Sequence, residues 1–294
     1  MNNIKIFNNS YDLLSFFKET KFESKEIIEI TIEINYYEEL GIKAFVDLAQ
    51  IYKMRLIAIN QENKDVELNF KKLNENSSFH KEKRGDEKYG VDSDFFKIDK
   101  ISQFNFLYYY QEALNFCDIK SKNKILNIGI NKGDEFEVIK NMLSKEEYNT
   151  KELVGIDYSK TIIKYAQDKF PQAKMIEADI NKLQDINIGR FDMLISIGTL
   201  QSSNINFNPI FMSLYQNNLN DNGAIILGFP NCRWLDGEMI YGAKVPNYSF
   251  SEMGMVLKDI HFCKKYLQQK GYRVVITGKD YLFLSARKIV NRVT

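Results

Sequence analysis

Apolar residues in the second half of the chain fall alternately into short runs and into helical spacing, the pattern of an α/β fold. The run Ile125–Ile130 predicts a strand buried on both faces. After Gly133 the apolar positions take helical spacing, with Asp134 and Glu135 in the first turn, where the helix dipole favours acidic side chains. This stretch therefore predicts a strand, a tight turn and a helix.

Further strands and helices follow in the same alternation. Strands are predicted at residues 153–157, 173–177, 191–196, 222–229, 272–277 and 281–285, and helices at 104–116, 159–170 and 251–270. The last two strands are joined by the short turn Gly278–Asp280. We therefore expect them to form a closing antiparallel hairpin.

The first part of the chain predicts a separate small unit. Residues 1–73 are expected to form an α+β accessory domain with a strand, a helix and two further strands, at residues 27–34, 36–53, 55–60 and 66–70. Residues 74–100 are rich in charges of both signs and predict a polar linker or lid, followed by a core at residues 101–294. We expect the accessory domain to serve as a dimerisation or lid module, which allows a homodimer through it.

Two glycines and one acid indicate how the core could bind a ligand. Gly129 and Gly133 lack a Cβ, so the turn between them can be tight and a ligand can lie against it. Asp157 ends the next strand, where a carboxylate can accept from both hydroxyls of a ribose. With these residues the chain resembles the class I S-adenosylmethionine-dependent methyltransferases, over residues 101–288.

The resemblance implies a fold and a cofactor. The expected fold is a Rossmann-like, seven-stranded methyltransferase sheet, mostly parallel with a closing antiparallel hairpin, and the expected cofactor is S-adenosylmethionine. The family's turn reads Gly-x-Gly-x-Gly after a strand with an acidic residue. Here Asn131 replaces the middle glycine and Asn127 replaces the acid. Asparagine is the non-glycine residue that best tolerates a left-handed backbone.

The resemblance also assigns cofactor-binding positions. Asp179 stands where the family has an acid that contacts the adenine amino group, and Ile180 where an apolar residue packs on the ring. The full expected cofactor set is Asn127, Gly129, Asn131, Gly133, Asp157, Tyr158, Asp179, Ile180 and Ser196. The polar linker could fold over this site, with Tyr89, Phe95 or Phe96 against the substrate.

The methyl acceptor is expected at the connection Pro230–Phe250. A loop of this length is usually functional, and it leaves the carboxyl edge of the sheet, where open α/β sheets bind ligands. Arg233, Trp234 and Tyr241 are the candidate substrate-binding residues, and glycines at 237 and 242 would let the loop move as a lid. The alternative is a surface loop whose Trp234 packs on the core.

Several other kinds of chemistry find little support. No glycine completes the Gly-x-Gly-x-x-Gly fingerprint of a dehydrogenase. Three cysteines without a close pair and two histidines predict no metal site and favour a cytoplasmic location, as does the lack of a signal sequence or of a bilayer-spanning apolar stretch. Cys232 is interpreted as a buried thiol and the lone His261 as structural. The net charge of +1 gives no general attraction to nucleic acid, although it does not exclude an RNA substrate.

Three hypotheses remain at this point. The first is methyl transfer to a small-molecule oxygen or nitrogen, because the core is complete and carries no nucleic-acid module. The second is a methyltransferase acting on tRNA or protein. The third is a catalytically degenerate S-adenosylmethionine-binding relative, which the changes at Asn127 and Asn131 motivate. No residue is identified as a catalytic base, and the sequence does not name the acceptor.

Overall fold

The computed structural model describes residues 6–62, 64–77, 90–93, 96–202, 204–243 and 253–289. The chain divides into two units. One short segment from the second half of the chain belongs to the N-terminal unit. The N-terminal unit comprises Met1–Glu82 together with Trp234–Tyr241, and the core unit comprises Lys83–Arg233 together with Gly242–Thr294. We did not expect from the sequence that a segment following the fifth core strand would belong to the N-terminal unit.

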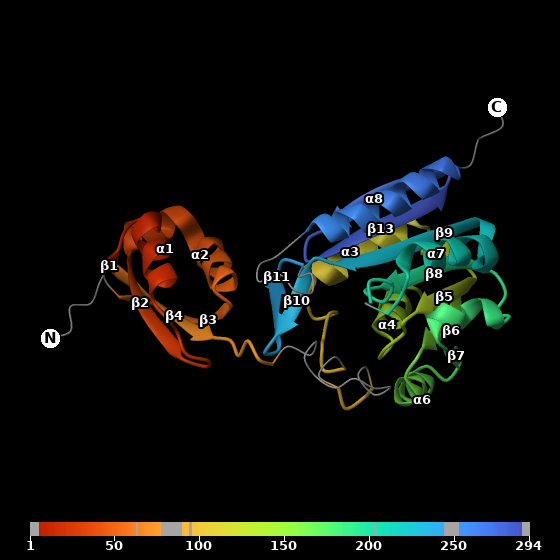
Figure 1. Cartoon of the computed structure of the whole chain (residues 1–294), viewed down its shortest axis with the longest axis horizontal. Coiled ribbons are helices and arrows are strands. Elements are labelled where there is room, and N and C mark those ends of the chain that lie inside the picture. The colour runs from red at the N-terminus through yellow and green to blue at the C-terminus, as the bar shows by residue number, and fades with distance from the viewer. Residues whose placement is uncertain are drawn as a thin grey trace. The chain divides into compact units, whose positions relative to one another are not determined.

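The core unit is built on a seven-stranded sheet with the order β12-β13-β9-β8-β5-β6-β7 (Figure 1). All neighbouring strands pair in parallel except at β13, which is antiparallel to both β9 and β12. The strands are β5 (Lys124–Ile128), β6 (Glu152–Asp157), β7 (Lys174–Glu177), β8 (Phe191–Ile197), β9 (Leu219–Pro230), β12 (Tyr272–Gly278) and β13 (Tyr281–Lys288). The predicted fold class, a mostly parallel seven-stranded sheet closed by an antiparallel hairpin, is confirmed.

Burial explains why the central strands read as apolar runs. Ile125, Leu126 and Ile128 of β5 are all fully buried, because β5 lies between β6 and β8 and is covered on both faces. One boundary differs from the prediction: β9 begins at Leu219, three residues before the expected start. The added residues, which are mostly polar, lie at an irregularity where the register with β8 shifts after Phe191.

Helices cover both faces of this sheet. The core contains α3 (Phe104–Phe116), α4 (Asp134–Met142), α5 (Lys145–Asn149), α6 (Lys160–Lys169), α7 (Phe207–Ser213) and α8 (Gly254–Gln269), with the short helical segments η3 (Ile119–Ser121), η4 (Ile180–Asp185) and η5 (Leu214–Asn218). Successive residues of β13 point to opposite faces: the Phe283 ring packs on Phe106 of α3, and Leu284 joins the cluster that contains Ile260 of α8.

The N-terminal unit is a four-stranded sheet with two helices. Its elements are β1 (Ile6–Phe7), α1 (Ser10–Glu19), β2 (Ile27–Glu33), α2 (Ile34–Ile51), β3 (Met54–Glu62) and β4 (Asp65–Lys72), and its strand order is β1-β2-β4-β3. Alternate residues of β2 and β4 form the core: Ile28, Ile30, Ile32, Val66, Leu68 and Phe70. The predicted strand, helix and two strands are confirmed.

Sequence reasoning missed α1. Its signal was present, because Asn9 caps the helix by accepting from the backbone N–H of Asp12, and Leu13 and Phe17 are buried at a spacing of one helical turn.

The expectation of a long, mobile loop at 230–250 is wrong for its first part. Strands β10 (Cys232–Leu235) and β11 (Glu238–Tyr241) form a hairpin. Asp236 and Gly237 join the strands, with φ angles of 52° and 77°. Positive φ at both central residues is what a two-residue hairpin turn requires, so Gly237 serves the turn and not a hinge. The remainder of the predicted loop, residues 244–250, lies outside the described residues, as do Tyr89 and Phe95.

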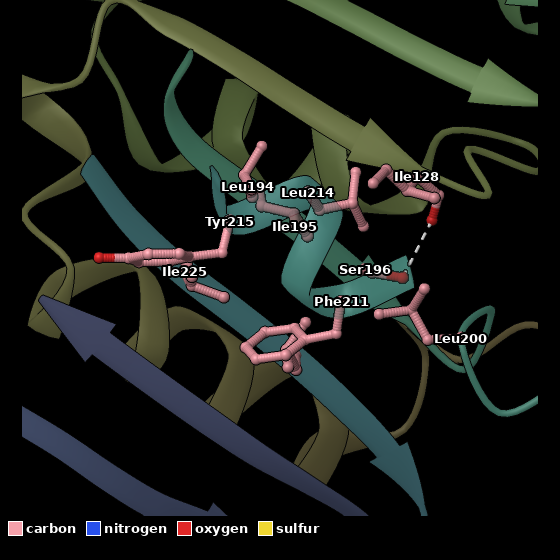
Figure 2. A pocket seen from close by; sticks show the side chains of 10 residues that line it. Ile128, Leu194, Ile195, Ser196, Leu200, Phe211, Leu214, Tyr215 and Ile225 are labelled. Carbon is pink, nitrogen blue, oxygen red and sulfur yellow. Dashed lines mark hydrogen bonds between the residues drawn. The ribbon is translucent and has the colours of Figure 1, made fainter. Parts of the chain in front are cut away.

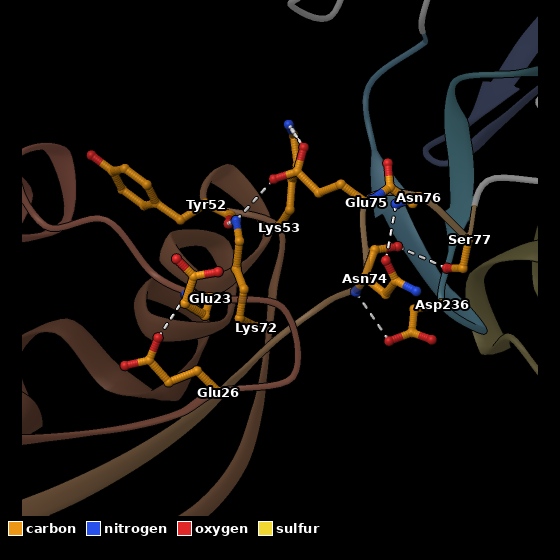
Figure 3. A network of polar contacts seen from close by, with 10 residues as sticks. All are labelled: Glu23, Glu26, Tyr52, Lys53, Lys72, Asn74, Glu75, Asn76, Ser77 and Asp236. Atoms are coloured by element: carbon orange, nitrogen blue, oxygen red, sulfur yellow. Dashed lines mark hydrogen bonds and ion pairs between the residues drawn. The ribbon is translucent and has the colours of Figure 1, made fainter.

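The hairpin is bonded into the N-terminal unit. Leu235 and Ile240 form a small buried cluster with Leu73, the residue that follows β4. The backbone N–H of Asn74 donates to Asp236, as Figure 3 shows, at 3.1 Å. The Gln50 amide of α2 donates to the Met239 carbonyl at 3.5 Å and accepts from the Tyr241 N–H at 3.3 Å.

Candidate functional site

The turn between β5 and α4 is left-handed at three alternate positions. Gly129, Asn131 and Gly133 have φ angles of 76°, 44° and 77°. The backbone N–H of Gly133 donates to the Ile130 carbonyl at 2.8 Å, which closes the turn. The prediction that Asn131 would adopt the left-handed conformation in place of a glycine is confirmed.

Each glycine of this turn is in contact with a side chain from another element. A Cβ on Gly129 would lie 1.8 Å from Oγ1 of Thr199, the second residue after β8. A Cβ on Gly133 would lie 2.3 Å from the ring of Phe170, which follows α6. The turn is therefore packed between the carboxyl end of β8 and the end of α6. Thr199 was not among the residues predicted to contact the cofactor.

Asp157 connects the turn to the end of β6. One carboxylate oxygen accepts from the backbone N–H of Asn131 at 3.1 Å, and the other from the N–H of Ser159 at 3.1 Å. Burial raises the pKa of Asp157, and the backbone hydrogen bonds from Ser159, Asn131 and Tyr158 oppose that rise. The carboxylate thus lies at the carboxyl edge of the sheet, between two adjacent strand ends.

The other expected cofactor residues lie in three different environments. Tyr158 is half exposed beside Asp157. Asp179 caps η4, where its Oδ1 accepts from the backbone N–H of Asn181 at 2.9 Å, and the following residue, Ile180, is buried in the core cluster. Ser196 is buried within β8.

Ser196 is buried and bonded to the neighbouring strand. Its hydroxyl donates to the Ile128 carbonyl of β5 at 3.4 Å, and its side chain lines an apolar cavity of about 10 Å³ between β8, α7 and β9 (Figure 2). Phe211 and Ile225 lie on the wall of the same cavity. A space of this size without several polar partners is a packing gap, too small for a cofactor.

A buried charged group lies beside the turn and was missed by the sequence reasoning. Lys100, in the segment before α3, forms an ion pair with Glu135 in the first turn of α4, and both side chains are at least 89% buried. The Asn127 amide donates to the other oxygen of Glu135 at 3.1 Å. Burial lowers the pKa of Lys100, but the nearby carboxylates of Glu135 and Asp134 outweigh it and hold the pKa above its usual value.

The expected substrate-binding residues are divided between the units. Arg233 belongs to the core unit and is half-buried. Trp234 and Tyr241 belong to the N-terminal unit, where Trp234 is 8% exposed and Tyr241 is 46% exposed. Trp234 is therefore a buried residue of the hairpin in the N-terminal unit, and the alternative of a surface loop with Trp234 packed on the core is not what the structure shows.

Thiols and metal-binding side chains add no further chemistry. Cys232 is buried, as expected, and burial raises its pKa well above the usual value. Within the described ranges, no group of three or more His, Cys, Asp or Glu side chains is arranged to hold a metal ion. In the same ranges no helix has both the length and the apolar content to cross a bilayer.

Comparison with known proteins gives the family. A family model described as a methyltransferase domain matches residues 119–276, more than half of the chain. A search of curated proteins finds no match. Among solved structures, the chain is similar to the plantazolicin methyltransferase BpumL in complex with SAH, at 14% identity and a TM-score of 0.48 over 70% of this chain and 94% of that one.

A second similar structure is a SAM dependent methyltransferase from Aquifex aeolicus, at 14% identity and a TM-score of 0.46 over 71% of this chain and 100% of that one. The family model alone decides the assignment, since it spans the strands that carry the glycine turn and Asp157. The chain belongs to the class I S-adenosylmethionine-dependent methyltransferase family, and its cofactor is S-adenosylmethionine.

Proposed function

We propose that the core unit binds S-adenosylmethionine across the carboxyl ends of β5 and β6 and transfers its methyl group to an oxygen or nitrogen of a small molecule. One observation carries this proposal. The backbone N–H of Asn131, in the left-handed turn, donates to Asp157 at 3.1 Å, so the turn and the carboxylate are joined into one surface.

Unpartnered acceptors support the fit of such a ligand. Oδ1 of Asn127 and Oδ1 of Asn131 are buried and have no hydrogen-bond partner among the described residues. Unpaired buried acceptors are rare and costly in folded proteins. The ribose hydroxyls and the ammonium of S-adenosylmethionine are donors of the kind that these oxygens lack.

Each residue has a part in this proposal. Asp157 accepts from the ribose hydroxyls, Gly129 and Gly133 supply the left-handed backbone of the turn on which the ligand lies, and Asp179 with Ile180 receives the adenine. Tyr158 remains a candidate beside the ribose. We assign no ligand contact to the Ser196 side chain, because its hydroxyl donates to Ile128.

The bound cofactor would supply an already activated sulfonium methyl group. The protein's contribution is then orientation and exclusion of water, which need few reactive side chains. No general base is proposed, and the acceptor's own nucleophilicity is expected to suffice.

A small acceptor agrees best with the charge around the turn. Asp157, Glu177 and Asp179 place carboxylates at the ends of β6 and β7, which offer no cation to a nucleic-acid phosphate. Arg233 of the core unit is the acceptor-binding candidate that we retain. Trp234 and Tyr241 remain sequence predictions.

Two departures from the family pattern had favoured a degenerate relative. Asn131 adopts the left-handed conformation that a glycine would supply, and Glu135 brings a carboxylate to Asn127. Both departures are thus compensated locally, which supports an active enzyme.

Following the methyl group tests the acceptor class. The protein would be incubated with S-[methyl-³H]adenosylmethionine and a cell extract, and the extract then separated into small molecules, RNA and protein. We expect label in the small-molecule fraction, and no transfer by the Asp157→Ala variant. Label in RNA or protein would favour the second hypothesis, and no transfer to any fraction would favour the degenerate one.

A further inference from the structure

The ion pair of Lys100 and Glu135 lies where the family's strand acid is missing. Asn127 occupies the acid's place in β5 and is fully buried. Its Nδ2 donates to Glu135, so the orientation of the amide is set and Oδ1 faces away from that carboxylate. A buried carboxylate and an unpaired acceptor therefore lie together at the end of the strand.

Lys100 comes from a different segment of the chain than the buried polar residues around it. Asn127, Asp134 and Glu135 belong to β5 and α4, whereas Lys100 enters from the segment before α3, 35 residues away from Glu135 in sequence. Its side chain is 11% exposed, against 1% for Glu135. Lys100 is thus the outermost member, and its ammonium lies against the carboxylate that the others hold in place.

The group holds one more carboxylate than ammonium. Two carboxylates, Asp134 and Glu135, are buried with one ammonium. Burial raises the pKa of Asp134, with Lys100 opposing the rise and Glu135 adding to it. A ligand ammonium would meet a carboxylate and an unpaired amide oxygen here.

We propose that Glu135 and Asn127 receive the ammonium of the cofactor's amino-acid end, and that Lys100 is the internal counter-ion that this ammonium displaces. The inference rests on the proposed function, since it concerns the same cofactor. A primary ammonium replaces a primary ammonium on one carboxylate, so the charge at Glu135 is balanced before and after binding.

Three ligands separate the ends of the cofactor. S-adenosylhomocysteine has both charges of the amino-acid end, S-adenosyl-3-thiopropylamine has only the ammonium, and 5′-methylthioadenosine has neither. Titration calorimetry with Glu135→Gln should show about tenfold or greater weakening for the first two ligands, because a charged hydrogen bond is lost, and unchanged affinity for the third. Glu137→Gln, on the same helix, is the matched control.

Removing the Lys100 ammonium should have the opposite effect on ligand affinity from Glu135→Gln. Lys100→Met leaves the buried Glu135 carboxylate without a counter-charge, so the free protein should melt at a lower temperature than the wild type. The ligand ammonium then supplies the missing partner, and S-adenosylhomocysteine and the amine analogue should bind more tightly, by a few-fold or more. Lys100→Gln keeps a donor to Glu135 and serves if the methionine variant does not fold. Lys140→Met, an exposed change on α4, is the control.

The outcomes are distinct. Weaker binding of S-adenosylhomocysteine by both Lys100 variants, with the amine analogue unaffected, would mean that Lys100 binds the ligand's carboxylate and would overturn the displacement. If Glu135→Gln changed the affinity for all three ligands equally, or for none of them, the ion pair would have a structural role only. A wild-type protein that binds none of the three would overturn the proposed function itself, and this inference with it.

Discussion

The side-chain amide of Asn127 donates to the carboxylate of Glu135, with 3.1 Å between Nδ2 and Oε2. The strand residue is neutral, and the negative charge is carried eight residues later, in the first turn of α4. The helix dipole favours a carboxylate in that turn, which offsets part of the cost of its burial. The site therefore keeps an acid beside the glycine turn although β5 lacks one.

Moving this charge back to the strand should be tolerated only as a pair of changes. Asn127→Asp alone places two buried carboxylates side by side, and Glu135→Gln alone leaves the Lys100 ammonium without its partner. Each should lower the free energy of unfolding by about 1–3 kcal/mol. The double variant should recover part of the loss, with a coupling energy of about 0.5–3 kcal/mol by urea denaturation.

Additive losses in the double variant would contradict this relationship. They would mean that the two side chains act independently and that Glu135 does not replace the acid of the strand. The exposed pair Lys43 and Asp47 of α2 offers a comparison, since removing either should change stability by less than about 1 kcal/mol.

Gly129 is predicted to be the least tolerant position of the turn. Gly129→Ala imposes a left-handed backbone on a residue with a Cβ, at about 1–2 kcal/mol, and the Cβ would collide with Thr199. We expect a lower melting temperature and weaker S-adenosylhomocysteine binding. Asn131→Gly is the control. It removes the backbone strain of a left-handed non-glycine residue, so its melting temperature should not fall below that of the wild type. Wild-type affinity in Gly129→Ala would show that the ligand does not depend on this turn.

The hairpin should stabilise the N-terminal unit through its apolar side chains. Ile240 is 1% exposed against Leu73 and Leu235, so Ile240→Ala should cost about 2–5 kcal/mol of unfolding free energy. Glu238→Gln removes only a partly exposed ion pair with Arg55 and should cost less than about 1 kcal/mol. Equal effects of the two changes would show that the hairpin is held by charge.

The packing of the hairpin on the N-terminal unit should affect the solubility of a fragment that lacks this unit. Removing residues 1–91 would expose the apolar face of the hairpin, so this fragment should be less soluble than one in which residues 234–241 are also replaced by a short polar linker. The fragment with the linker should still bind S-adenosylhomocysteine. Equal solubility of the two fragments would indicate that the hairpin does not need its partner strands.

Sequence reasoning succeeded where the signal was local. The apolar run of β5, the glycines after it and the acid at the end of β6 specify the sheet and its ligand edge within about 35 residues, because buried parallel strands and tight turns leave strong composition signals. The hairpin could also have been found, since Asp236–Gly237 between two apolar segments is a strong hairpin signal.

The rest depended on contacts between distant segments. Lys100 lies in a stretch that reads as a polar linker, and only the folded chain brings it to Glu135. Thr199 is an ordinary residue after a strand until Gly129 is seen against it. Ser196 was assigned to the cofactor from its strand position, and only the folded chain shows its hydroxyl donating to the carbonyl of Ile128 on the neighbouring strand.

Cofactor binding should depend on pH through Asp157. Burial raises the pKa of this carboxyl above its usual value of 3.8. The ionised form is the one that accepts from ribose hydroxyls, so S-adenosylhomocysteine affinity should fall as the pH drops through the raised pKa and should be constant above it. Asp157→Asn should bind weakly with a flatter profile, measured by fluorescence titration. An identical profile in both proteins would assign the titration to another group.

Titration of the full-length protein with S-adenosylhomocysteine measures cofactor binding at the ends of β5 and β6. We expect binding of one ligand per chain, weakened about tenfold or more by Asp157→Ala, because a charge-assisted contact to the ribose is lost. The absence of binding at millimolar ligand, or binding of NADH in its place, would contradict this expectation.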